Sequence, residues 1–143
     1  MRSAVLLLLT ITLSACAGLD SRTDPAMPAG ANAQAASLAG MKPAGLALLQ
    51  QSQTQQAAGE YAQAAATLER AIRIESTHPA PWIELGRVRL MEGDYQQAEQ
   101  VGRKAQSLAV GNPAAESASL QLIIDALRSQ GRYLEARELA YGD

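Results

Sequence analysis

Apolar residues from about residue 44 onward recur every three or four positions, which is the period of a helix with one buried face. Leu68 and Ile72 follow this spacing in one segment, and Leu85 and Val88 follow it in another. Short segments that contain Gly, Asp, Asn or Pro separate these apolar stretches. The pattern therefore predicts an all-α domain whose helices lie at about 44–57, 61–75, 80–92, 95–109, 114–130 and 133–141.

A six-residue motif occurs three times in this region. Gly-Glu-Tyr-Ala-Gln-Ala at 59–64 recurs 34 residues later as Gly-Asp-Tyr-Gln-Gln-Ala at 93–98. Gly-Arg-Tyr-Leu-Glu-Ala at 131–136 follows after a further 38 residues, so four residues are inserted, around 110–117. Such a period is typical of helical-repeat proteins, in which each repeat forms a helix pair that packs on its neighbours.

The residues around each motif favour helix ends. The glycine that opens each copy is expected to end one helix with a positive φ, which glycine adopts without steric cost. Asp94 is expected to cap the helix that follows it. Asn112 followed by Pro113 is expected to begin the next helix in the same way.

These motifs resemble the tetratricopeptide repeat, whose pattern contains Trp, Leu-Gly, Gly-x-Tyr-x-x-Ala and a later Ala. The resemblance implies a right-handed α-solenoid of about three helix-turn-helix repeats, at about 45–78, 79–112 and 117–143, within a domain of residues 43–143. The positions that match the family pattern are Gly59, Tyr61, Ala64, Ala71, Trp82, Leu85, Gly86, Gly93, Tyr95, Ala98, Ala105, Gly131, Tyr133 and Ala136.

Several positions depart from the family pattern. Gly102 stands where a large apolar residue is usual, so we expect a weaker core in the second repeat. Ile124 stands where a small residue is expected, and Arg89 where Tyr is usual. Leu134 and Leu139, near the end of the last repeat, are expected to remain partly exposed.

Residues 1–15 have the pattern of a secretory signal peptide, with Arg2 before an apolar run at 4–13. That run is shorter than the roughly 20 apolar residues that a membrane-spanning helix needs. Leu-Ser-Ala-Cys at 13–16 resembles the lipobox of bacterial lipoproteins, in which the Cys receives diacylglycerol and becomes the N-acylated first residue. Ordinary cleavage after Ala17 also fits the segment, but the lipobox accounts for the position of the sole cysteine, Cys16.

Residues 16–42 are predicted to be the lipidated cysteine and a flexible tether, because they consist mostly of Ala, Gly, Ser, Asn, Gln and Pro. Lipoproteins with Asp after the modified Cys are usually retained at the inner membrane, whereas this chain has Ala17. The resemblance therefore implies a lipid anchor in the outer membrane, with the folded domain facing the periplasm.

Composition excludes several classes of protein. Twelve basic and fourteen acidic residues leave a charge near neutral, which argues against nucleic-acid binding. One Cys and one His exclude an internal disulfide framework and a multi-His metal site, and His78 is expected in a surface loop. No phosphate-binding loop or activated nucleophile is visible. We expect a non-enzymatic protein with no metal, cofactor or small-molecule substrate, apart from the acyl groups on Cys16.

A repeat array instead offers an extended concave surface for a protein partner. In tetratricopeptide-repeat proteins the first helix of each pair lines this groove. The corresponding residues here are Leu49, Gln53, Gln56, Ile83, Glu84, Arg87, Met91, Gln121, Asp125 and Arg128. Relatives that bind chaperone tails hold a carboxylate with Lys, Asn and Arg, but the matching positions here are Leu49, Gln53, Glu84, Ala118 and Leu122. That carboxylate clamp is therefore absent.

The order of lipobox, tether and small repeat domain resembles the LpoP-type activators of bifunctional penicillin-binding proteins. This resemblance implies a peptidoglycan synthase as the protein partner. Two alternatives remain open, namely a pilotin or assembly lipoprotein for a type IV pilus or secretin, and a generic adaptor for periplasmic proteases or hydrolases. The missing catalytic residues argue against an envelope enzyme or a small-ligand carrier.

Overall fold

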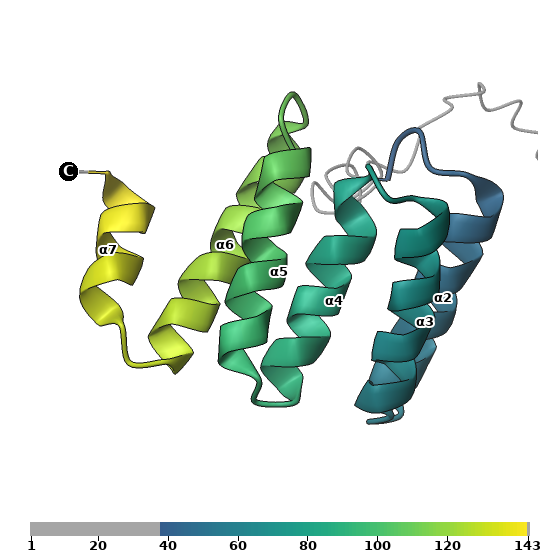
Figure 1. Ribbon diagram of the computed structural model, residues 1–143, viewed down its shortest axis with the longest axis horizontal. Helices are drawn as coiled ribbons and strands as arrows, with labels where there is room; N and C mark the ends of the chain where they lie inside the picture. Colours follow the sequence, from purple (N-terminus) through teal and green to yellow (C-terminus); the bar gives the residue numbers. More distant parts are fainter. Residues whose placement is uncertain (1–37, 143) are drawn as a thin grey trace, which may run out of the picture.

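The computed structural model describes residues 38–142 of the chain. They form the helices α2 (Pro43–Ala57), α3 (Tyr61–Ile74), α4 (Pro79–Met91), α5 (Tyr95–Leu108), α6 (Pro113–Ser129) and α7 (Tyr133–Tyr141), shown in Figure 1. No β-strand occurs in this part of the chain. Each helix begins and ends within one residue of its expected bounds, so the all-α prediction is confirmed.

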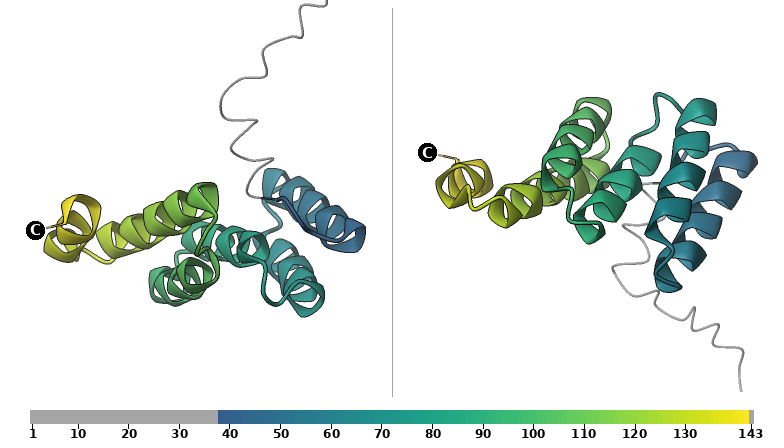
Figure 2. Two further views of the ribbon diagram at one scale, coloured as in Figure 1. Left: turned by 90° about the horizontal axis from the view of Figure 1, so that it is seen from above. Right: turned by 60° about the horizontal axis from the view of Figure 1, so that its bottom comes forward.

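Consecutive helices pair as hairpins, and the hairpins stack on one another. Each helix contacts the next, and α4 also contacts both α2 and α6. Seen from above, α2, α4 and α6 lie on one side of the array while α3 and α5 lie on the other (Figure 2). The domain is thus a right-handed α-solenoid of about three helix-turn-helix repeats, as the repeat motif implied.

The turn within each pair has the predicted glycine geometry. Gly59, Gly93 and Gly131 have φ values of 76°, 80° and 78°. After the last of these, the Arg132 N–H donates to the Leu127 carbonyl oxygen at 2.9 Å, which satisfies a carbonyl group at the helix end. A side chain at these φ values would be strained, which is why the motif begins with glycine.

Both predicted N-terminal caps, at Asp94 and Asn112, form. The Asp94 carboxylate accepts a hydrogen bond from the Gln97 N–H at 3.1 Å. The Asn112 side chain accepts one from the Ala115 N–H at 3.1 Å, directly before Pro113. Each cap satisfies a backbone donor that has no partner within its own helix.

The four extra residues of the third repeat lengthen a helix and leave the preceding loop unchanged. The connections before α4 and α6 have the same length, at residues 75–78 and 109–112. Helix α6 has 17 residues, whereas α4 has 13. Because four residues make about one helical turn, α6 is one turn longer than α4. Its residues on either side of the added turn therefore still face the same sides of the helix.

The alanines that match the family pattern are buried between the helices. Ala64, Ala71, Ala98 and Ala105 are 0% exposed, and Ala136 is 1% exposed. Their small side chains let paired helices approach closely. Larger apolar residues fill the space between the helix pairs in three clusters. The first, near the first repeat, contains Leu49, Leu68, Leu85 and Val88. The second contains Ile83 with half-buried Trp82, and the third contains Ile123, Ile124 and Leu127.

Gly102 has a packing role that differs from the sequence expectation. A Cβ atom there would lie 3.0 Å from Ile123 Cγ1 and 3.2 Å from Leu122 Cγ. A Cβ atom at Gly86 would collide with the Leu122 side chain. Leu122 is 3% exposed, so α6 supplies from its own side the apolar group that Gly102 lacks. The expected weak core was wrong, because the glycine makes room for a neighbouring helix.

The packed residues extend back to Leu38, before the expected start of the domain at residue 43. Met41 is 9% exposed and belongs to the first core cluster, against which Leu38 also packs. The Lys42 N–H donates to Glu75 Oε1 at 2.7 Å. His78 Nδ1 accepts from the Ala80 N–H at 3.3 Å, which leaves Nε2 to donate to the Ala39 carbonyl at 3.1 Å. His78 thus caps α4 and holds the entering chain.

Glu99 joins the second repeat to the third. This residue on α5 is 8% exposed. Its Oε1 accepts from Arg103 at 3.0 and 2.8 Å, and its Oε2 accepts from Gln130 at 2.9 Å and from Arg132 at 2.6 Å. Because Gln130 and Arg132 lie in the turn between α6 and α7, one carboxylate fixes that turn against α5.

The surroundings of Glu99 also set its pKa. Burial by itself raises the pKa, but the hydrogen bonds from Gln130 and Arg103 and the charge of Arg132 outweigh it. The pKa of Glu99 is therefore lowered from its ordinary value of 4.5. Glu135, which Arg132 also binds, has a lowered pKa for the same reason.

The last helix is held on one side. Ala136 is buried, and Leu139 and Ala140 are half-buried against Ile123, Ile124 and Leu127. Leu134 is 70% exposed, as expected for the end of the array. The tyrosines of the repeat motif become more exposed towards the end of the array. Tyr61 is half-buried, Tyr95 is 37% exposed and Tyr133 is 68% exposed.

The contact between Gly86 and Leu122 predicts a non-additive mutant cycle. Gly86→Ala should destabilise the domain by about 1–3 kcal/mol through overpacking, and Leu122→Ala by about 2–5 kcal/mol through a cavity. In the double variant the methyl group added at position 86 has room, so stability should equal or exceed that of Leu122→Ala alone. Urea unfolding measures all three, and additive losses would contradict the packing described.

The lowered pKa of Glu99 predicts acid sensitivity. A carboxylate whose pKa is lower in the folded state contributes stability above its unfolded pKa, and this is lost as pH falls through the folded value. Urea midpoints measured from neutral pH to about pH 3 should therefore fall below about pH 4.5. Glu99→Gln should lower stability at neutral pH and flatten this dependence. Equal slopes for wild type and Glu99→Gln would exclude Glu99 as the cause.

Candidate partner-binding groove

Helices α2, α4 and α6 present one continuous face of the solenoid (Figure 2). Each packs one side against the helix that follows it in its own hairpin, and this side carries its apolar residues. The side facing away from α3 and α5 carries mostly polar residues, and the exposed large apolar side chains of these helices are Leu46 and Met91. This polar face is the candidate groove.

The ten residues expected in the groove differ in accessibility. Five are exposed, namely Gln53, Arg87, Met91, Gln121 and Arg128, and three are half-buried, namely Gln56, Glu84 and Asp125. Leu49 and Ile83, at 4% and 3% exposure, are packed in the core. They support the groove from beneath and are not accessible to a partner, because their positions on the helices turn towards α3 and α5.

The charges of the groove are paired within their own helices. Arg87 forms an ion pair with Glu84 one turn earlier on α4. On α6, Arg128 lies 3.9 Å from Asp125, whose carboxylate also accepts from Gln121 Nε2 at 2.8 Å. The face therefore offers both signs of charge close together and has no uniform field. Such a surface does not select for a strongly acidic or strongly basic partner.

One polar group of the groove is left without a partner. Gln56 Nε2, near the end of α2, is buried and has no hydrogen-bond acceptor among residues 38–142. An unsatisfied buried donor is costly, and rotation of the half-buried Gln56 side chain towards an acceptor on a partner would relieve the cost. Gln53, one turn earlier, is exposed beside it.

The absent carboxylate clamp has a structural reason. Leu49 and Leu122 occupy two of the positions that would carry clamp residues, and both are buried, at 4% and 3% exposure. Leu122 is the side chain that lies against Gly86 and Gly102. These two positions serve packing and are not available to hold a ligand carboxylate.

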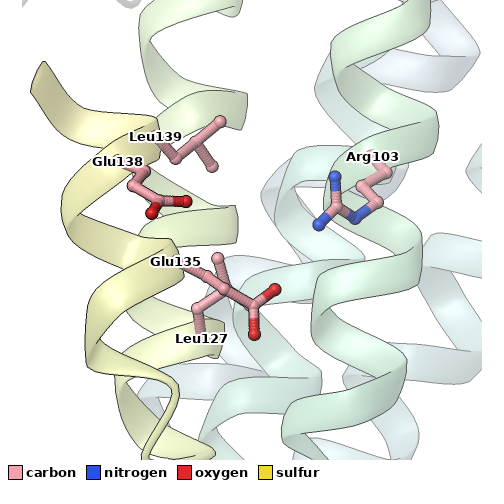
Figure 3. A pocket seen from close by; sticks show the side chains of 5 residues that line it. All are labelled: Arg103, Leu127, Glu135, Glu138 and Leu139. Atoms are coloured by element: carbon pink, nitrogen blue, oxygen red, sulfur yellow. The ribbon is translucent and has the colours of Figure 1, made fainter. Parts of the chain in front are cut away.

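A second hollow lies outside the groove, between α5 and α7. It has a volume of about 340 Å³ and is lined by Arg103, Leu127, Glu135, Glu138 and Leu139. Figure 3 shows Arg103 on one wall and the two glutamates of α7 on the other. The hollow could not be predicted from the sequence. No motif marks it, because it arises from the spacing between two helices that are not consecutive in the chain.

Residues 38–142 contain no cluster of His, Cys, Asp and Glu that could hold a metal ion. None of their helices has the length and apolar character needed to span a bilayer. The single histidine is used as a helix cap.

Comparison with known proteins agrees with the geometry. The tetratricopeptide-repeat family matches residues 55–122. No curated protein sequence matches the chain. Among solved structures, the globular C-terminal domain of LpoP from P. aeruginosa is 41% identical, with a TM-score of 0.66. The match covers 70% of this chain and 97% of the LpoP domain.

Tetratricopeptide repeats are protein-interaction modules, and the chain has one face of the corresponding helices open to a partner. The identity to the LpoP domain extends over nearly the whole of that domain. The chain therefore belongs to the tetratricopeptide-repeat family and is an LpoP-like protein.

Proposed function

We propose that this protein is a lipid-anchored regulator of a peptidoglycan synthase, and that it acts from the outer membrane without catalytic activity of its own. The observation that supports this most is the 41% identity over 97% of the LpoP domain. The LpoP-type resemblance implies a bifunctional penicillin-binding protein as the partner. The lipobox and the following segment support the anchor, although Cys16 and residues 17–37 lie outside the described part of the chain.

The groove suits a folded, uncharged or mixed-charge partner surface. Its arginines are exposed at the ends of their ion pairs, at 46% for Arg87 and 51% for Arg128, so each guanidinium has donors to spare. Gln53 and Gln56 supply neutral donors and acceptors on the neighbouring helix. In this proposal the groove binds the active conformation of the synthase more tightly than the inactive one, and thereby shifts its population.

The segment between the anchor and the domain sets the available reach. The 21 residues 17–37 separate Cys16 from the first described residue, Leu38. Fully extended, they would span at most about 70–75 Å. The chain enters the solenoid at the junction of α3 and α4, where Lys42 and Ala39 bond to Glu75 and His78. The domain therefore begins within this distance of the outer membrane, and the groove can lie further away by the length of the domain itself.

Crosslinking in living cells tests the proposed partner. A photoreactive residue at Gln121, which is exposed on α6, should capture a bifunctional penicillin-binding protein, identified by mass spectrometry. The same residue at Gln63, exposed on α3 on the opposite side of the solenoid, serves as the control and should not capture it. Capture of secretin or pilus subunits, or of proteases, without a synthase would instead favour the assembly-lipoprotein or adaptor alternative.

The proposed anchor predicts that palmitate labelling depends on Cys16. Cys16→Ala should abolish incorporation of labelled palmitate, because the chain has no other thiol. Ala17→Asp should keep the label but move the protein to the inner-membrane fraction. Label that persists in Cys16→Ala would rule out the lipoprotein assignment.

The proposed groove predicts that Arg87→Glu combined with Gln53→Ala weakens synthase binding by about fivefold or more, which corresponds to about 1 kcal/mol. Arg73→Glu, the same charge reversal at an exposed site on α3, should leave the affinity unchanged. Titration with purified synthase measures the dissociation constant, and thermal unfolding shows whether each variant is folded. Unchanged affinity in the double variant would move the interface away from the groove.

A further inference from the structure

Helix α7 has an exposed face opposite the one that packs on α6. Leu134, Arg137, Glu138 and Tyr141 are all exposed and follow the i, i+3, i+4, i+7 spacing of a single helix face. Leu134 is 70% exposed and Tyr141 80%. The packed face of α7 is formed by Ala136, Leu139 and Ala140, which lie on the other side of the helix.

The charges on this face have no partner in the domain. Neither the Arg137 guanidinium nor the Glu138 carboxylate forms an ion pair or hydrogen bond with any residue in 38–142. In contrast, Arg132 and Glu135 on the neighbouring side are paired with each other. Helix α7 is the last helix of the array (Figure 1), and its exposed face carries two apolar ends and two opposite charges without an ion-pair partner among residues 38–142. Glu138 lies at the edge of this face, where it also lines the hollow between α5 and α7.

The order of these four residues makes the strip complementary to itself. When two copies of α7 lie antiparallel about a twofold axis between positions 137 and 138, Leu134 of one copy faces Tyr141 of the other. Arg137 then faces Glu138 of the other copy, and the symmetry repeats both contacts. Each apolar end meets an apolar end, and each charge meets its opposite, as an isologous interface requires.

We propose that α7 binds α7 of a second copy of this chain, antiparallel, through Leu134, Arg137, Glu138 and Tyr141. A helix of nine residues is about 14 Å long. The contact is thus smaller than the about 1,200–2,000 Å² of stable soluble interfaces. The pairing is therefore a weak one that forms where the chains are concentrated. It uses none of the groove residues, so both grooves remain open to partners.

Photocrosslinking of the full chain in cells tests the pairing. p-Benzoyl-phenylalanine in place of Tyr141 should give a homodimer band, with the crosslink mapped to residues 133–138 of the second copy. The same substitution at Tyr95, which is 37% exposed on α5, is the matched control and should give no homodimer. Absence of the homodimer, or capture of other proteins alone, would overturn the proposal.

Charge reversal provides the decisive comparison. Arg137→Glu makes the central pair of positions wholly acidic, and Glu138→Arg makes it wholly basic. Each variant alone should therefore lose the homodimer by about fivefold or more. Co-expressed with different tags, the two should crosslink to each other at about the wild-type level, because every central contact is again between opposite charges. A band that survives either single reversal, or no heterodimer on co-expression, would refute the pairing.

Discussion

The close seating of Leu122 against two glycines determines how the third repeat meets the second. Gly86 on α4 and Gly102 on α5 leave room for this side chain, and a methyl group at either would press on it. Glu99 then fixes the α6–α7 turn to α5 through Gln130 and Arg132. One contact is apolar and the other ionic, and together they set the position of α6 beside α4. The shape of the groove depends on that position.

The same helices serve both the core and the surface. On α4, Ile83 and Leu85 are buried, while Arg87 and Met91 face outward. Because the candidate groove stands on buried side chains, a partner bound there would meet a preformed surface, and little order would have to be created on binding. Its charged groups are paired within their own helices, and Gln56 Nε2 is buried without a hydrogen-bond partner among residues 38–142.

The helices could be read from the sequence because their signals are local. The glycines at positive φ and the Asp94 cap each depend only on residues nearby in the chain. The length of each helix pair follows from the spacing of these signals. The role of Gly102 could not be read, because the side chain that fills its space comes from another helix. The burial of Leu49 and Ile83 depends on how their helices are rotated about their axes. The docking of Met41 depends on core residues that are distant in the sequence. The hollow beside Arg103 and the bonds to Glu99 likewise require the tertiary arrangement. The helices of the candidate groove and most of its exposed residues were therefore predictable, whereas the burial of Leu49 and Ile83 was not.

Regulation of a synthase is tested by the rate at which a purified bifunctional penicillin-binding protein polymerises glycan strands from its lipid-linked precursor. Adding the mature, lipidated chain in detergent should raise this rate in a saturable manner. The variant carrying Gln53→Ala and Arg87→Glu should need a higher concentration for the same effect. A rate that stays unchanged while the two proteins bind would contradict regulation and leave a tethered repeat scaffold in its place.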